Sequence, residues 1–110
     1  MTHSLLPALL LSAVAAASPP TVAVYKTKCE SCHMASGGSP LEELNFADGK
    51  WKHGSRPADI ARVITEGVPG TAMQPFKKQL TPQQIARLAA YVRGFDKTRK
   101  AAAGRSITPP

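Results

Sequence analysis

The chain has 110 residues, and its 14 lysines and arginines outnumber its seven aspartates and glutamates, so the formal net charge is +7. This length allows one domain and excludes a large multidomain enzyme. Aromatic residues make up only 5% of the chain, so the protein core is thin and would gain stability from a cofactor at its centre.

The N-terminal segment is predicted to be a secretory signal peptide covering residues 1–17. An apolar run ends in three alanines at 15–17, and no charged residue precedes Lys26. Such small residues suit signal peptidase, and the run is shorter than the ~20 residues that a membrane-spanning helix needs. We therefore expect an exported protein with no stable membrane span. The alternative is a buried helix of a cytosolic protein, because no lysine or arginine precedes the run.

Thr21 is the predicted N-cap of the first helix of the mature chain, which ends in the Ser-Gly-Gly-Ser-Pro cluster at 36–40. Val22, Tyr25 and Cys29 recur along it at three- and four-residue spacing, which indicates one buried face. We expect this face to cross the last helix of the domain.

Two shorter helical segments follow. One possible turn lies around 42–44, and an amphipathic helix begins near Pro57 and is closed by Gly67. The segment 68–79 contains Pro69, Gly70 and Pro75 and is predicted to be a loop.

The last helix carries the clearest signals. Thr81 is a predicted N-cap, Pro82 suits the first turn, Gln84 completes a capping box, and Gly94 ends the helix. An apolar stripe follows helical spacing at Ile85, Leu88, Ala89 and Val92. Because no segment alternates like a β-strand, the sequence predicts an all-α domain over residues 18–96, with long loops that wrap around something other than protein.

A basic tail is predicted at 97–110. It carries four bases and no acid, whereas residues 18–96 hold ten bases and seven acids, hence +3. Its Ala, Gly and Pro content predicts disorder. Nucleic acid is not an expected partner, because aromatic residues are not interleaved with the bases.

The sequence Cys29-Glu30-Ser31-Cys32-His33 is the C-x-x-C-H pattern of covalent haem attachment. On a helix the two sulfurs and the imidazole project from one face, so two thioether bonds and one iron ligand can reach the same porphyrin. A thioredoxin-like motif is disfavoured because no βαβ pattern surrounds it. A strained disulfide is the remaining alternative.

The iron needs a ligand on its opposite face, and Met73 is the expected one. Met1 leaves with the signal peptide, and Met34 is too close to His33. Met73 lies in a loop rich in glycine and proline, where a core methionine is unusual. His53 is the competing ligand. Ligation by His and Met leaves no open position and suits one-electron transfer.

These motifs together resemble the class I (mono-haem) cytochrome c family, most closely its small soluble bacterial members. The likeness rests on C-E-S-C-H, on S-P-L at 39–41, on G-V-P-G-T-A-M at 67–73, and on L-A-A-Y-V-R at 88–93. The resemblance implies an all-α cytochrome c fold, three to five short helices and long loops around one covalently attached haem c.

The resemblance also implies roles for single residues. Cys29 and Cys32 would carry the thioethers, and His33 and Met73 would ligate the iron. The Pro40 carbonyl would accept the imidazole N–H of His33, and Trp51 would lie near a haem propionate, although Trp51 could equally be a core residue. The crossing of the first and last helices would involve Val22, Tyr25, Leu88 and Tyr91.

The function implied by this resemblance is one-electron transfer, without catalysis, between periplasmic redox partners such as a dehydrogenase or a terminal oxidase. The protein would be a monomer or a small subunit of such a complex. A different class of function, a haem sensor or enzyme in which Met73 is displaceable, would need a distal group such as His53 or Gln74. Lysines at 26, 28, 77 and 78 could rim the exposed haem edge, and the alternative is that they belong to ordinary solvated faces.

Overall fold

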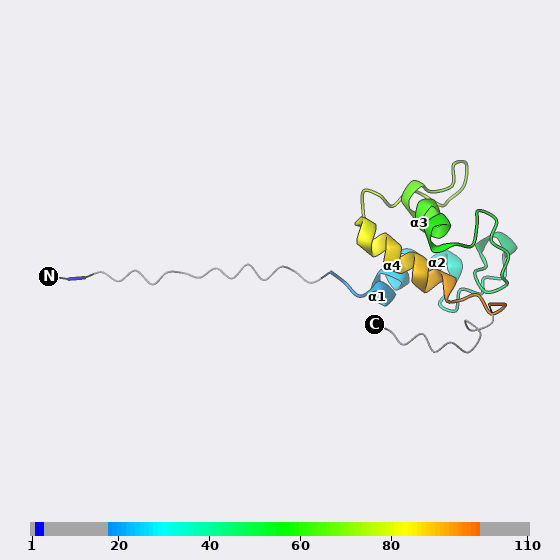
Figure 1. The fold of residues 1–110 in the computed structure, drawn as a ribbon, viewed down its shortest axis with the longest axis horizontal. Helices are drawn as coiled ribbons and strands as arrows, with labels where there is room; N and C mark the ends of the chain where they lie inside the picture. The colour runs from blue at the N-terminus through cyan, green and yellow to red at the C-terminus, as the bar shows by residue number, and fades with distance from the viewer. Residues whose placement is uncertain (1, 4–17, 100–110) are drawn as a thin grey trace.

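The computed structural model describes residues 2–3 and 18–99. In chain order its elements are α1 (Thr21–Lys28), α2 (Glu30–His33), the 3₁₀ turn η1 (Glu42–Leu44), α3 (Pro57–Glu66) and α4 (Pro82–Arg93). These residues contain no β-strand (Figure 1), so the predicted all-α class is confirmed. No helix among them has the length and apolar character needed to cross a membrane. The predicted signal peptide, apart from residues 2 and 3, and the tail beyond residue 99 lie outside the described residues.

The helix α4 begins with the predicted capping box. The Thr81 hydroxyl accepts the Gln84 N–H at 3.1 Å, and the Gln84 side chain accepts the Thr81 N–H at 2.9 Å. Pro82 occupies the first turn, where its missing N–H costs nothing, and Gly94 caps the other end. Local chemistry therefore fixes both ends of this helix.

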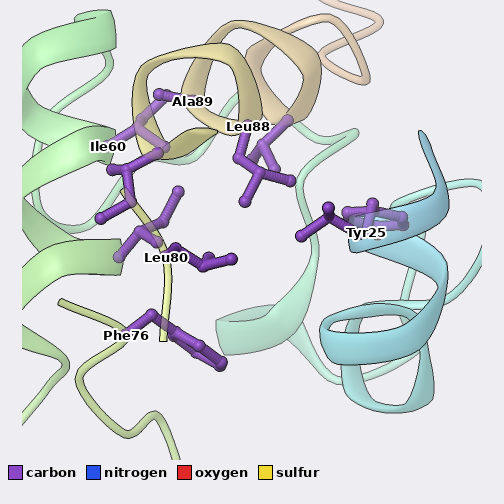
Figure 2. Close-up of a cluster of buried hydrophobic side chains, with 10 residues drawn as sticks. Tyr25, Ile60, Phe76, Leu80, Leu88 and Ala89 are labelled. Atoms are coloured by element: carbon purple, nitrogen blue, oxygen red, sulfur yellow. The ribbon is translucent and has the colours of Figure 1, made fainter. Parts of the chain in front are cut away.

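The core lies beneath α4, which packs against both α3 and α1. The four residues of its apolar stripe are all buried, and Leu88 and Tyr25 are the largest fully buried side chains. Figure 2 shows α4 crossing over the cluster, with Ile60 of α3 on one side of Leu88 and Tyr25 of α1 on the other. Through this contact α4 sets the position of α1, and with it the C-x-x-C-H segment that follows.

The first helix differs from the expectation in its boundaries and its buried face. The Pro20 carbonyl accepts the Val24 N–H at 3.1 Å, so Pro20 and not Thr21 is the N-cap. Val22 is 55% exposed, whereas Val24 is buried beside Tyr25. Side chains lean toward the N-terminus of a helix, which places Val22 at the open end of this two-turn element. The predicted crossing is therefore correct for Tyr25, Leu88 and Tyr91 but wrong for Val22.

The start of the predicted disordered tail is bound to the domain. The Lys97 N–H donates to the Ala47 carbonyl at 3.0 Å, and Thr98 and Arg99 both donate to Asp96. Hydrogen bonds to Ala47 and Asp96 therefore continue to Arg99, the last of the described residues.

A buried carboxylate anchors the start of α3. Asp59 accepts the backbone N–H of Arg56 at 3.2 Å and two bonds from its guanidinium at 2.9 and 3.0 Å. The Arg62 guanidinium lies 3.5 Å away. The hydrogen bonds from Arg56 hold the pKa of the Asp59 carboxyl below its usual range. This carboxylate therefore stabilises the folded state while it is ionised.

Because the pKa of Asp59 is lower in the folded than in the unfolded chain, its contribution to stability is present at neutral pH. It is lost as the pH falls below about 4 and through the folded-state pKa. We expect Asp59→Asn to lower the free energy of unfolding at pH 7, with a difference from wild type that shrinks toward pH 2. Urea unfolding at several pH values measures this. A difference independent of pH, or an equal effect of the exposed control Glu43→Gln, would contradict it.

Candidate functional site

The C-x-x-C-H residues lie on one helical turn. Cys29 breaks the helix between α1 and α2, with φ −123° and ψ −36°, and its carbonyl accepts the N–H groups of Cys32 at 3.2 Å and His33 at 3.0 Å. Cys29 is half-buried against the hydrophobic core, Cys32 is exposed, and both are free thiols. Burial raises the pKa of the Cys29 thiol, and the Lys28 ammonium opposes this effect. The turn thus gathers two sulfurs and one imidazole.

The imidazole of His33 has a defined tautomer. Its Nδ1 lies 2.9 Å from the Leu44 carbonyl oxygen, and because a carbonyl can only accept, Nδ1 carries the proton and Nε2 carries the lone pair. Burial lowers the pKa of His33, with the Leu44 hydrogen bond opposing it. A neutral imidazole with a free Nε2 is the form that ligates a metal.

The carbonyl that orients His33 belongs to Leu44 and not, as expected, to Pro40. Leu44 is the last residue of η1, and the final carbonyls of a helical turn have no partner within it. Its oxygen is therefore free to accept the imidazole N–H. Pro40 is exposed and lies before η1. The sequence predicted the turn at 42–44, but it did not predict that the last carbonyl of this turn accepts the hydrogen bond from His33.

Two aromatic side chains extend from the imidazole. The ring of Phe46 stacks on His33 with centroids 4.2 Å apart and planes 18° apart. Trp51 stacks on Phe46 at 5.8 Å and 10°. The indole N–H of Trp51, which was expected near a propionate, donates to the Asp96 carboxylate at 2.9 Å. Phe46 and Asp96 were not predicted, since no short-range pattern links either of them to His33.

Met73 lies in a loop closed by its own hydrogen bonds. The Val68 N–H donates to the Met73 carbonyl at 2.9 Å. The Thr71 hydroxyl donates to the Val68 carbonyl at 2.8 Å and accepts the Met73 N–H at 3.1 Å. Met73 is half-buried against the same hydrophobic cluster as Cys29. The loop therefore presents the Met73 thioether to the core from a segment separate from His33.

Gly67 makes this loop possible. Its φ is +68°, and a Cβ at this position would lie 2.7 Å from both the Met73 carbonyl oxygen and the Pro75 nitrogen. Both neighbours are backbone atoms, which cannot move aside as a side chain can. The backbone that carries Met73 thus approaches α3 closely only because residue 67 is glycine.

The competing ligand His53 is exposed. It lines a surface cavity of about 270 Å³ together with residues of α3 and of the following loop, namely Arg62, Val63, Glu66, Gly67, Val68 and Pro69. A solvated imidazole is a poorer candidate for a shielded iron site than a half-buried thioether. The difference in burial therefore favours Met73 over His53.

The donor set fits haem c. Two thiols on one turn can form thioethers with a porphyrin, an imidazole with its lone pair on Nε2 can ligate iron, and a thioether from a second loop can complete the coordination. Cys29 and Met73 both pack against the core, which is where a largely apolar cofactor gains most from burial.

Comparisons with known proteins identify the family to which the chain belongs. A sequence model of the family described as cytochrome c oxidase, cbb3-type, subunit III matches residues 17–92. The chain belongs to this family of c-type cytochromes. Its members carry covalent haem c, so the fold and cofactor expected from the motifs are confirmed.

Individual relatives are consistent with this assignment. The structure of the KustC0563 c-type cytochrome aligns over 72% of this chain and 100% of its own, with a TM-score of 0.61 and 34% identity. The cbb3-type cytochrome c oxidase subunit FixP of Sinorhizobium medicae is 38% identical over 79 residues, 63% of this chain. A subunit of the nicotinate dehydrogenase of Pseudomonas putida is 33% identical over 78 residues, 64% of this chain. The chain spans only 27% and 7% of the lengths of these last two proteins.

The close approach at Gly67 predicts a selective effect of substitution. We expect Gly67→Ala to displace the Met73 backbone and to weaken or abolish the far-red absorption band of a methionine–iron bond in the ferric protein. Gly70→Ala is the matched control, because Gly70 also has a positive φ, +79°, but a Cβ there meets no atom within 4 Å. Both variants bear the cost of a left-handed alanine, about 1 kcal/mol. Equal loss or equal retention of the band in the two proteins would contradict the role given to Gly67.

Proposed function

We propose that this cytochrome is a single-haem electron carrier in which Cys29 and Cys32 hold the porphyrin. His33 Nε2 ligates the iron on one face and the Met73 sulfur on the other. Haem c held in this way supplies exchange of one electron between ferrous and ferric iron. The protein residues fix the cofactor, orient the imidazole and shield the iron from water.

The observation that carries this proposal is the pairing of two shielded donors from separate segments. The Leu44 carbonyl leaves the lone pair of His33 on Nε2, and the loop held by Gly67 presents Met73 to the core. When both axial positions are filled by protein, no site is open for a substrate. This arrangement favours electron transfer over ligand chemistry, because His53 and Gln74 are both exposed.

Export to the periplasm is part of the same proposal. The apolar run and the alanines at 15–17 support a signal peptide over residues 1–17 that is cleaved after residue 17.

A second candidate is a haem subunit of a larger redox complex. The relatives named above are a subunit of a cbb3-type oxidase and a subunit of a dehydrogenase. In such a complex this chain would accept electrons from a dehydrogenase or pass them to a terminal oxidase, while the partner performs the chemistry. The role of the haem site is the same in both cases.

The exposed lysines at 26, 28, 77 and 78 support a docking surface for an anionic partner. The Lys28 ammonium donates to the Gln79 side chain at 3.0 Å, across 51 residues of sequence. This contact brings the lysines of α1 toward the pair at 77 and 78. Lys77 is paired with Glu66 at 3.4 Å, whereas Lys26 and Lys78 form no ion pair with any residue in the described ranges.

We expect charge reversal of the two unpaired lysines to slow electron exchange with an anion. In Lys26→Glu/Lys78→Glu, oxidation of the ferrous protein by hexacyanoferrate(III) should be about tenfold slower at low ionic strength, and the difference should vanish at high salt. Stopped-flow absorbance measures the rate. The exposed lysines at 50 and 52 supply a control of equal charge in the variant Lys50→Glu/Lys52→Glu. Equal slowing in both variants would show that net charge, and not this surface, determines the rate.

Carbon monoxide separates the carrier from the ligand-binding alternative. The ferrous wild-type protein should not bind carbon monoxide at neutral pH, because Met73 fills the sixth position. Met73→Ala should bind it readily and so proves that the assay detects an open site. Absorbance titration of both proteins is the measurement. If the wild type binds carbon monoxide as readily as Met73→Ala, Met73 does not hold the iron firmly, and the sensor or enzyme class is favoured.

A further inference from the structure

The turn that follows α4 is organised by both oxygens of one carboxylate. Asp96 Oδ1 accepts the Thr98 N–H at 2.9 Å, the Thr98 hydroxyl at 2.6 Å and the Arg99 N–H at 3.2 Å. Its Oδ2 accepts the Trp51 indole N–H at 2.9 Å, from a residue 45 positions earlier. These hydrogen bonds also lower the pKa of Asp96, so the carboxylate is ionised at neutral pH. One oxygen closes the local turn, and the other holds a distant loop.

The same turn touches this loop at two further points. The Lys97 N–H donates to the Ala47 carbonyl at 3.0 Å. Gly49 has φ +75°, and a Cβ there would collide with the Thr98 side chain. The turn 96–98 therefore packs against the loop 46–51 and is held there by a side-chain hydrogen bond, a backbone hydrogen bond and a close contact.

The loop 46–51 also contacts the imidazole of His33, through the ring of Phe46. Trp51, Phe46 and His33 form a stack of nearly parallel rings, with 10° between the first two planes and 18° between the last two. The hydrogen bond to Leu44 fixes the position of Nδ1 but leaves the ring able to turn about that bond. A flat ring 4.2 Å away on one face restricts this remaining rotation.

We propose that Asp96 is a positioning residue for the proximal imidazole, acting through Trp51 and Phe46 to set the plane of the His33 ring. This inference rests on the proposed ligation of iron by His33. A residue of the segment after α4 then helps to fix the electronic environment of the iron. Neighbouring groups that orient a ligating histidine are known to tune the metal it binds.

Two substitutions remove the hydrogen bond between Trp51 and Asp96. Asn at position 96 has a single acceptor oxygen, so Asp96→Asn cannot both close the local turn and hold the indole. Trp51→Phe keeps an aromatic ring for stacking, and it removes the N–H donor together with the second ring of the indole. Glu42→Gln is the control, because it removes one carboxylate charge from an exposed ion pair with Lys50 and leaves the stack untouched.

The measurement is the proton NMR spectrum of the ferric haem protein, in which the chemical shifts of the four haem methyl groups depend on the direction of the axial ligand planes. We expect Asp96→Asn and Trp51→Phe to change the order or the spread of these shifts. Both variants should retain the far-red methionine–iron band, and Glu42→Gln should give the wild-type pattern. A purely structural role for Asp96 would lower the unfolding temperature of the variants without moving the methyl shifts.

Unchanged methyl shifts in both variants, with the methionine–iron band intact, would overturn the positioning role and leave the proposed function standing. Absence of the band or of covalent haem from the wild-type protein would instead overturn the ligation on which the inference rests. If Asp96→Asn fails to fold, Trp51→Phe still decides, because it removes the same hydrogen bond and keeps an aromatic ring at position 51.

Discussion

The hydrogen bond between His33 Nδ1 and the Leu44 carbonyl is the contact on which the proposed site depends. It fixes the tautomer, and so leaves the lone pair on Nε2. Without it the imidazole could present either nitrogen. The acceptor is available because it ends a short turn and has no partner within that turn. A local feature of the chain thus determines the chemistry of a side chain 11 residues earlier.

The helical framework positions the two segments of the chain that carry the proposed site. The stripe of α4 fixes α1 through Tyr25 and fixes α3 through Ile60. The C-x-x-C-H turn continues from α1, and the Met73 loop continues from α3. Few large side chains of the described residues are fully buried, and the proposed haem-binding residues Cys29 and Met73 pack against the edge of the core. This distribution agrees with a domain whose core is completed by a cofactor.

Features governed by neighbours in sequence were predictable. The capping box of α4, its glycine end and the single turn of Cys29, Cys32 and His33 follow from residue types at fixed spacing. Contacts between distant segments were not. Nothing in the sequence around Leu44 or Asp96 indicates that one meets His33 and the other meets Trp51, since both pairings arise only when the loops fold back. The prediction that Val22 lies in the helix crossing was wrong for a different reason. A two-turn helix buries only the side chains that face its partner, and Val22 is exposed.

The visible spectrum of the protein, exported in a host that attaches haem, tests the central claim most directly. The account predicts a covalent c-type spectrum that survives acid–acetone extraction, with the weak far-red ferric band of a methionine–iron bond. A covalent spectrum that lacks this band would contradict ligation by Met73. A colourless protein would contradict the whole site and would return Cys29 and Cys32 to thiol chemistry.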